Sequence, residues 1–135
     1  PPSMQRSPGY RDVLAEVEAF LRARAAAARE QGIPPERIWL DPGIGFGKLL
    51  EHNLALLRGV PRLAHLGHPV VVGASRKSWL GQLTGRPVED RLPGTLAADL
   101  WCAARGAGVL RVHDVRAHRD ALAVSRALDT GGGNA

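Results

Sequence analysis

Cysteine is almost absent from this sequence, and long apolar runs are missing. Cys102 is the single cysteine among 135 residues, so no internal disulfide can form, which fits a reducing cytosol. Its apolar neighbours predict a buried structural thiol and not a nucleophile. There is no run of roughly 18 apolar residues, so we expect no membrane span. The first residues also lack the basic-then-apolar layout of a secretory signal.

Aromatic residues and lysines are scarce as well. Aromatics make up 4% of the chain, and the arginines behind the net charge of +5 are scattered. Nucleic-acid binding needs clustered positive charge, usually with aromatic side chains for stacking, so we expect no nucleic-acid partner. Only two of the 18 basic residues are lysines, Lys48 and Lys77, and both follow short apolar runs. In an arginine-rich sequence, such a lysine indicates a specific role for a compact donor.

Helical and strand-like segments alternate along the chain. After a loop over 1–10, an apolar stripe predicts a helix; the stripe comprises Val13, Val17, Phe20 and Leu21. Continuous apolar runs predict strands, which are expected at 38–40, 70–72 and 109–112. Further helices are expected to begin at the candidate N-caps Asn53 and Thr95, the second ending at Gly106, and a last helix over 115–128. The glycine-rich residues 130–135 are expected to form a disordered tail.

The predicted order α-β-α-β-α-β-α defines an α/β fold. The strands begin near 38, 70 and 109, so one unit recurs about every 32 to 39 residues. Continuous apolar strands are typical of a parallel sheet covered by helices, and right-handed crossovers would make successive strands neighbours. A doubly wound sheet and part of a (β/α)8 barrel both fit. Polar residues follow all three strands, whereas the crevice of an open sheet draws mainly on two, so the barrel is favoured.

A polar and glycine-rich segment follows the first predicted strand. Residues 41–48 read D-P-G-I-G-F-G-K, which matches neither common phosphate-loop spacing. Asp41 is either a turn-forming residue or a carboxylate that accepts from a planar pair of donors. The glycines would let the backbone approach a flat ligand. Phe46 would either stack on that ligand or pack under the loop.

Cationic and hydroxyl side chains follow the other two strands. Ser75 is either a helix N-cap or part of a helix terminus that suits a carboxylate ligand, and Lys77 follows it. Arg111 and His113 alternate along the third strand, so both should lie on the same side. A charged side chain there requires a partner, so the two readings are a structural ion pair, with Asp114 or an absent segment, and an anion site. The other histidines (His52, His65, His68 and His118) show no metal-ligand spacing and are interpreted as surface or packing residues.

Taken together, these motifs resemble the C-terminal part of the dihydropteroate synthase family. The resemblance rests on residues 41–48, on 72–77 (V-G-A-S-R-K) and on 111–115 (R-V-H-D-V), in this order. Residues 2–5 (P-S-M-Q) also look like the loop after that family's fifth strand. The resemblance covers about residues 1–128 and implies a partial (β/α)8 barrel, with 1–135 as the C-terminal part of one pterin-binding domain.

The resemblance also implies an activity and roles for site residues. The family condenses 7,8-dihydropterin-6-ylmethyl diphosphate with p-aminobenzoate, releases pyrophosphate and uses magnesium. Asp41 and Lys77 would bind the pterin, and Arg111 and His113 would hold the leaving diphosphate. The p-aminobenzoate would meet Ser75 and Phe46. Gly73 is also counted among the substrate-binding residues, and Lys77, Arg111 and His113 are the expected catalytic residues.

The first five strands of such a barrel are absent, and with them the main expected ligand of Mg²⁺. We therefore expect a fragment that is inactive alone, belonging to a cytoplasmic enzyme that is homodimeric at full length. Two alternatives remain open. One is a pterin-binding methyltransferase of the same fold, which would need no diphosphate clamp. The other is a remnant without catalytic activity.

Overall fold

Two parallel strands form the centre of the protein. In this computed structural model, which describes residues 11–46 and 48–133, β1 (Val70–Val72) pairs with β2 (Ala107–Leu110). The pairs are Val70 with Ala107, Val71 with Val109 and Val72 with Leu110, with an irregularity after Val70. The third predicted strand thus begins two residues earlier than expected and ends at Leu110. The N–H of Arg111 still donates to Val72 O at 2.9 Å, which holds the start of the following loop against β1.

The first predicted strand, 38–40, is reduced to a single bridge. Leu40 pairs in parallel with Val70, donates to Pro69 O (2.9 Å) and accepts from Val71 N (2.7 Å). The direction and place of the segment are therefore as expected, but its extent is not. A 3-10 helix, η1 (Pro35–Arg37), ends immediately before it, and Pro42 follows without an N–H to donate. Little backbone is left for a ladder.

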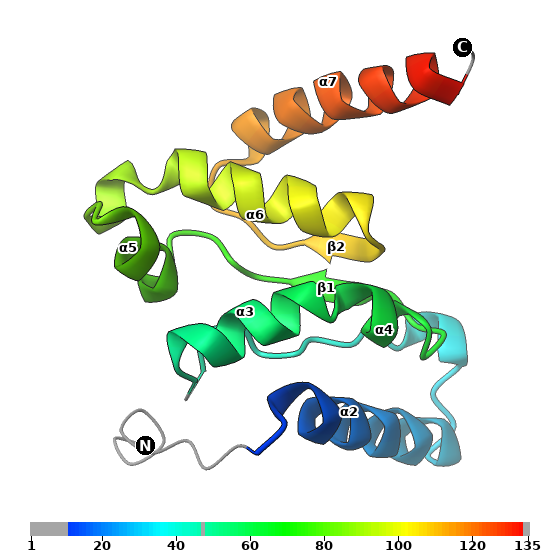
Figure 1. Ribbon diagram of the computed structural model, residues 1–135. Helices are drawn as coiled ribbons and strands as arrows, with labels where there is room; N and C mark the ends of the chain where they lie inside the picture. Colours follow the sequence, from blue (N-terminus) through cyan, green and yellow to red (C-terminus); the bar gives the residue numbers. More distant parts are fainter. Residues whose placement is uncertain (1–10, 47, 134–135) are drawn as a thin grey trace.

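Helices flank the strands (Figure 1). The long ones, α2 (Val13–Glu30), α6 (Leu92–Ala104) and α7 (Val115–Gly133), lie in this order from the lower to the upper side of the view, with α2 and α7 at opposite ends. Between α2 and the strands lie α3 (Leu50–Arg58) and α4 (Val60–Ala64). The loop after β1 leads to α5 (Ser78–Thr84) and then to a 3-10 helix, η2 (Val88–Asp90). The alternation of helices and parallel strands confirms the predicted α/β class.

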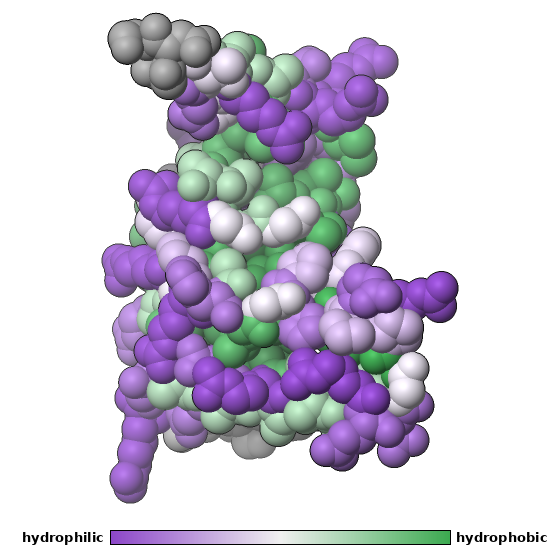
Figure 2. All heavy atoms as spheres, turned by 90° about the vertical axis from the view of Figure 1, so that its right-hand side faces the viewer, coloured by the Kyte–Doolittle hydropathy of each residue, from purple (hydrophilic) through white to green (hydrophobic). Residues whose placement is uncertain are grey.

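The core lies between these helices and β1. Fully buried side chains include Leu56, Val60, Leu63, Val70 and Val72. Burying an aliphatic side chain of this kind stabilises a fold by about 1.5–3 kcal/mol. All three residues of β1 are buried, whereas β2 is only partly covered, because among the described residues it pairs with β1 alone. The face on the right of Figure 1 shows apolar side chains in its middle part and hydrophilic side chains at its edges (Figure 2).

Several predicted helix boundaries are wrong. The helix expected from Asn53 begins at Leu50, and that expected from Thr95 begins at Leu92, so both residues lie inside helices and are buried. The helix expected to end at Gly106 ends at Ala104. Phe20 was placed on the apolar stripe of the first helix, but it is 64% exposed. The last helix continues to Gly133, so residues 130–133 are helical and not a disordered tail.

Some predictions concern residues outside the described ranges. These are the loop at 1–10, including the 2–5 motif, Gly47 and the last two residues of the tail. Within the described ranges, no helix is both long and apolar enough to cross a membrane.

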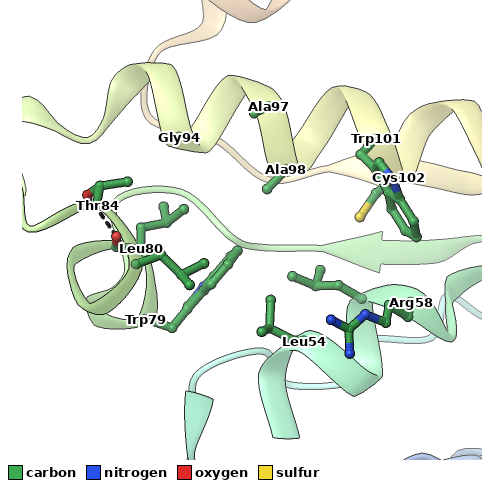
Figure 3. Close-up of a pocket in the computed structure, with 12 residues that line it drawn as sticks. Leu54, Arg58, Trp79, Leu80, Thr84, Gly94, Ala97, Ala98, Trp101 and Cys102 are labelled. Atoms are coloured by element: carbon green, nitrogen blue, oxygen red, sulfur yellow. Dashed lines mark hydrogen bonds between the residues drawn. The ribbon is translucent and has the colours of Figure 1, made fainter. Parts of the chain in front are cut away.

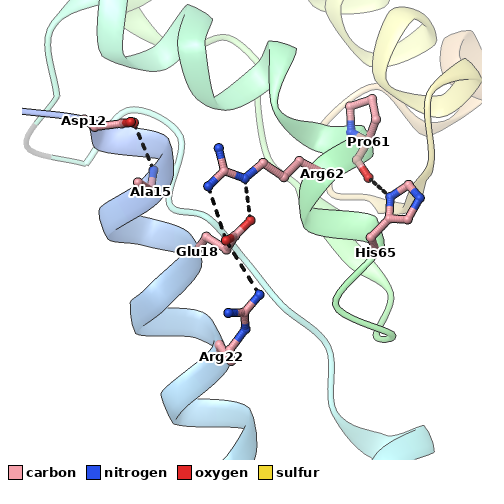
Figure 4. Close-up of polar contacts among 7 residues, drawn as sticks. All are labelled: Asp12, Ala15, Glu18, Arg22, Pro61, Arg62 and His65. Carbon is pink, nitrogen blue, oxygen red and sulfur yellow. Dashed lines mark hydrogen bonds and ion pairs between the residues drawn. The ribbon is translucent and has the colours of Figure 1, made fainter.

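An ion pair joins α2 to α4 (Figure 4). Arg62 donates from Nε to Glu18 Oε2 at 2.6 Å and from Nη2 to Oε1 at 3.3 Å, while Arg22 approaches Oε1 at 3.6 Å. The hydrogen bond from Arg62 holds the pKa of Glu18 below its ordinary value. At the start of α2, Asp12 accepts from the N–H of Ala15 at 3.0 Å and caps the helix.

Candidate functional site

The predicted site residues meet at the carboxyl ends of the parallel strands. Asp41 follows the Leu40 bridge, and its Oδ2 accepts from Arg111 Nη1 at 3.0 Å, after β2. Ser75, after β1, lies with its Oγ 2.7 Å from His113 Nδ1. A small pocket of about 150 Å³ is lined by Gly73, Ser75, Lys77, Arg111, Val112 and His113. All three strand ends therefore contribute to one cluster.

Asp41 performs two structural roles in this cluster. Its Oδ1 accepts from the N–H of Gly43 at 2.8 Å, which is the local turn predicted as one reading. Its Oδ2 pairs with Arg111, so the ion pair predicted for Arg111 exists, but with Asp41 and not Asp114. The two side chains are 56% (Arg111) and 37% (Asp41) exposed. Exposed pairs contribute about 0–1 kcal/mol, so a ligand can replace this one at little cost.

The glycine-rich loop is fastened by side chains from outside it. Gly45 has φ of 93° and donates to Asn53 Oδ1 at 2.7 Å. A Cβ on Gly45 would lie 3.0 Å from Lys77 Cδ, so glycine lets the lysine stem cross the loop. Lys77 Nζ in turn donates to Ile44 O. Asn53 is thus a site residue that the sequence reading missed, since its polarity was interpreted as a helix cap.

Lys48 binds the same loop from the other side. Its Nζ donates to Gly43 O at 2.9 Å and to Phe46 O at 2.8 Å. The Phe46 ring is not packed under the loop: the residue is 65% exposed, and Lys77 Nζ lies 5.0 Å from the ring centroid. Both lysines therefore donate to carbonyl groups of one loop, and Phe46 beside them stays largely exposed to solvent.

The electrostatic environment weakens the protonated form of both lysines. Burial lowers the pKa of Lys77, and the nearby positive charges of Arg111 and Lys48 lower it further, whereas Asp41 opposes this shift. Burial also lowers the pKa of Lys48, again opposed by Asp41. Such a concentration of positive groups is suited to an anionic ligand, which would remove part of their mutual repulsion.

Ser75 connects the loop after β1 to the loop after β2. It is buried, and besides its 2.7 Å contact with the His113 ring it accepts from the backbone N–H of His113 at 3.3 Å. Ser75 is not the predicted N-cap, because α5 begins at Ser78 and its N-cap position is Lys77. The hydroxyl instead orients the imidazole of His113, whose side chain remains exposed.

Gly73 allows close packing of the arginine. A Cβ at this position would lie only 2.4 Å from Nη2 of Arg111 and 3.0 Å from its Cζ. The guanidinium therefore lies directly against the backbone at the end of β1, and a larger residue would displace it.

A second pocket, of about 390 Å³, lies on another part of the molecule between α3, α5 and α6 (Figure 3). Its lining is mainly apolar and includes Leu54, Trp79, Leu80 and Trp101. Arg58 and Cys102 lie at one end of this pocket. Burial raises the pKa of the Cys102 thiol to about 12, which agrees with the predicted structural role. We therefore place the chemistry at the strand ends.

The other four histidines, which the sequence indicates are surface or packing residues, contact protein groups, and His52 Nδ1 accepts from the N–H of Leu49. His65 bonds to Pro61 O, His68 to Arg29 and Pro35 O, and His118 to Asp99 and Asp114 O. Within 11–46 and 48–133, no group of three or more His, Cys, Asp or Glu side chains is arranged to hold a metal ion.

Comparison with known proteins agrees with this geometry. Residues 1–113 match the family model described as "Pterin binding enzyme". The dihydropteroate synthase of Neisseria meningitidis serogroup B is 51% identical over 132 residues, which are 95% of this chain and 46% of that protein. The chain thus spans about half the length of the curated relatives it matches.

Solved structures give the same relationship. Dihydropteroate synthase from Thermus thermophilus, in complex with 4-aminobenzoate, is 53% identical with a TM-score of 0.89, covering 95% of this chain and 52% of that one. The enzyme from Xanthomonas albilineans, in complex with 7,8-dihydropteroate, is 51% identical with a TM-score of 0.89, covering 91% and 47%. The observed α/β order is accordingly part of a (β/α)8 barrel, as predicted. On its fold, its strand-end cluster and these matches, the chain belongs to the pterin-binding enzyme family.

Proposed function

We propose that this chain is part of a dihydropteroate synthase, which joins 7,8-dihydropterin-6-ylmethyl diphosphate to p-aminobenzoate and releases pyrophosphate. The observation that carries the proposal is the meeting of Asp41, Lys77, Arg111 and His113 at one edge, beside an exposed aromatic ring. A carboxylate next to several cationic groups suits a heterocycle with ring N–H donors that carries an anionic leaving group.

The pterin is assigned to Asp41 and Lys77. The Asp41 carboxylate would accept from the amino and ring N–H groups, and Lys77 would donate to the pterin's oxygen and ring nitrogen. Binding would require Asp41 to exchange Arg111 for the pterin. The exposure of that ion pair makes the exchange inexpensive and frees the guanidinium for the diphosphate.

The diphosphate is assigned to Arg111 and His113. The reaction develops negative charge on the leaving group as its bond to the pterin methylene breaks. Fixed cationic donors aimed at that charge lower the barrier. The Arg111 guanidinium lies against the backbone at Gly73, and Ser75 orients the ring of His113, so both donors are positioned once the pterin has taken the place of Arg111 at Asp41.

The p-aminobenzoate is assigned to Ser75 and Phe46. Its carboxylate would lie at Ser75 and the segment leading to α5, and its ring beside the exposed ring of Phe46. The amine needs little activation beyond being placed in line with the methylene carbon. A methyltransferase of the same fold would have no use for the arginine and histidine after β2, which favours the synthase.

Magnesium, dimerisation and a cytoplasmic location remain part of the proposal. The described residues offer no cluster of metal ligands, so we assign none of them to Mg²⁺ and route no step through it. The ion's main ligand would come from the portion of a full-length relative that this chain does not match. For the same reason we expect the isolated 135-residue chain to be inactive.

A chimera tests the function. The matching region of the Neisseria meningitidis enzyme, 132 residues long, is replaced by this chain, and dihydropteroate formation is measured. We expect an active chimera and an inactive isolated chain. Arg111→Met should lower kcat by about 100-fold or more, since it removes a donor from the developing charge. Arg24→Met, at an exposed position of α2, is the matched control. A chimera that folds but makes no dihydropteroate would refute the proposal.

A further inference from the structure

Buried polar residues occupy one face of α6. Thr95 and Asp99 are four residues apart, so they lie on the same face of the helix, and both are 0% exposed. Burial raises the pKa of Asp99, although its hydrogen bond to His118 opposes this. Burying a carboxylate is unfavourable unless it is bonded, so this pair of residues requires an explanation beyond packing.

Thr95 binds the loop after β1. Its Oγ1 accepts from the backbone N–H of Arg76 at 3.2 Å. Arg76 has φ of 57°, a left-handed conformation that residues other than glycine seldom adopt. The hydrogen bond to Thr95 therefore supports an unfavourable backbone conformation between Ser75 and Lys77, and this conformation sets the directions in which both side chains leave the chain.

Asp99 binds the loop after β2 through His118. Its Oδ2 lies 2.7 Å from His118 Nε2, and His118 Nδ1 lies 2.8 Å from the carbonyl oxygen of Asp114. A carbonyl only accepts, so Nδ1 carries a hydrogen and donates it to Asp114. Among the described residues Asp99 Oδ1 is buried without a partner, so His118 is the side chain that holds this carboxylate.

An ion pair closes these contacts into a ring. Arg76 Nη2 donates to Asp114 Oδ1 at 2.9 Å. The ring passes from Arg76 to Thr95, along helix α6 to Asp99, and through His118 and Asp114 back to Arg76. The ring joins Arg76, which follows Ser75, to Asp114, which follows His113. Ser75 and His113 are themselves hydrogen-bonded to each other. Helix α6 thus sets the alignment of the loops after β1 and β2 through Thr95 and Asp99.

We propose that Thr95 and Asp99 are positioning residues, which hold the loops after β1 and β2 in the alignment that substrate binding at Ser75, Lys77 and His113 requires. The inference deepens the proposed function and rests on it, because the groups that are positioned are those assigned to substrates. Thr95 acts through the Arg76 backbone, and Asp99 acts through His118 and the Asp114 carbonyl.

The test uses the chimera described above. Thr95→Val keeps the shape of the side chain and removes the acceptor, and Thr95→Ser restores the hydroxyl. We expect Thr95→Val to raise KM for p-aminobenzoate by roughly 10-fold, as for the loss of one positioning hydrogen bond. Thr95→Ser should stay close to the parent. Thr84→Val is the control, since Thr84 bonds to Leu80 O and to the Arg86 N–H within its own segment.

A lower melting temperature with an unchanged KM would overturn the proposal, because it would indicate a structural role alone. If Thr95→Val does not fold, Asp114→Asn provides the test. Asp114 is partly exposed, and its substitution weakens the ion pair with Arg76, so we expect the KM for p-aminobenzoate to rise by about 3-fold. An unchanged KM in Asp114→Asn would then also overturn the proposal. An inactive unsubstituted chimera would instead point to failure of the proposed function.

Discussion

Gly73 determines where the Arg111 guanidinium can lie, so Gly73→Ala gives a quantitative test of the site. An added Cβ would be 2.4 Å from Nη2, 3.0 Å from Cζ and 3.1 Å from Nε, whereas ordinary contact begins at 3.4 Å. The distance to Nη2 is about 1 Å shorter than ordinary contact, so the guanidinium must move away by about that much. A misplacement of that size lowers rates by about 100-fold, and we expect this loss in kcat/KM of the chimera.

Stability should change little in the same variant. Losing the exposed pair between Arg111 and Asp41 costs about 0–1 kcal/mol. Replacing a glycine stabilises by about 0.4–1 kcal/mol through the unfolded chain, which offsets that cost. The assays are steady-state formation of dihydropteroate and thermal unfolding. Gly94→Ala, whose Cβ would meet the flexible end of Leu80 at 3.2 Å, is the control. Activity of Gly73→Ala within about 2-fold of the parent would contradict the role of Arg111.

Three further predictions concern charge. Glu18→Gln should lower the melting temperature at neutral pH, and the difference from the parent should shrink as the pH falls below 4.5. The hydrogen bond from Arg62 lowers the pKa of Glu18, so the stabilisation by this ion pair is lost once the carboxylate is protonated in the folded protein. An equal decrease at all pH values would contradict this. Burial and the charge of Arg111 lower the pKa of Lys77 from its ordinary value of 10.5, so the activity of the chimera should begin to fall with rising pH before pH 10.5 is reached. The residual activity of Lys77→Met should lack that decline. Burial raises the pKa of Cys102 to about 12, so the thiol should not react with a thiol reagent near neutral pH in the native protein and should react after unfolding. The absorbance of the product released by the reagent measures the reaction.

The alternation of elements and the identity of the main site residues could be read from the sequence. Apolar runs at 70–72 and around 109 have a strand's length and composition, and each is followed by polar residues. Because parallel strands present their carboxyl ends at one edge, Asp41, Lys77 and Arg111 could be placed together before their contacts were known. The scarcity of lysine in an arginine-rich sequence also indicated a specific role for Lys48 and for Lys77.

The boundaries and the supporting residues could not be read in this way. Asn53 and Thr95 are common N-cap types, and both were assigned as caps. In the fold each is buried within a helix and accepts a hydrogen bond from the backbone of a loop outside that helix, 8 residues away for Asn53 and 19 for Thr95. Residues 130–133 have a composition typical of a flexible tail, yet the preceding helix extends through them.

Sequence alone determined the period of each segment and the chemical groups at the strand ends, because these depend on residues that are close along the chain. Tertiary structure decided the partners. The bond between Asp41 and Arg111 spans 70 residues, that between Ser75 and His113 spans 38, and that between Asp99 and His118 spans 19. Such pairings follow from how helices pack on the strands, and local periodicity carries no information about which distant atoms come within hydrogen-bond distance.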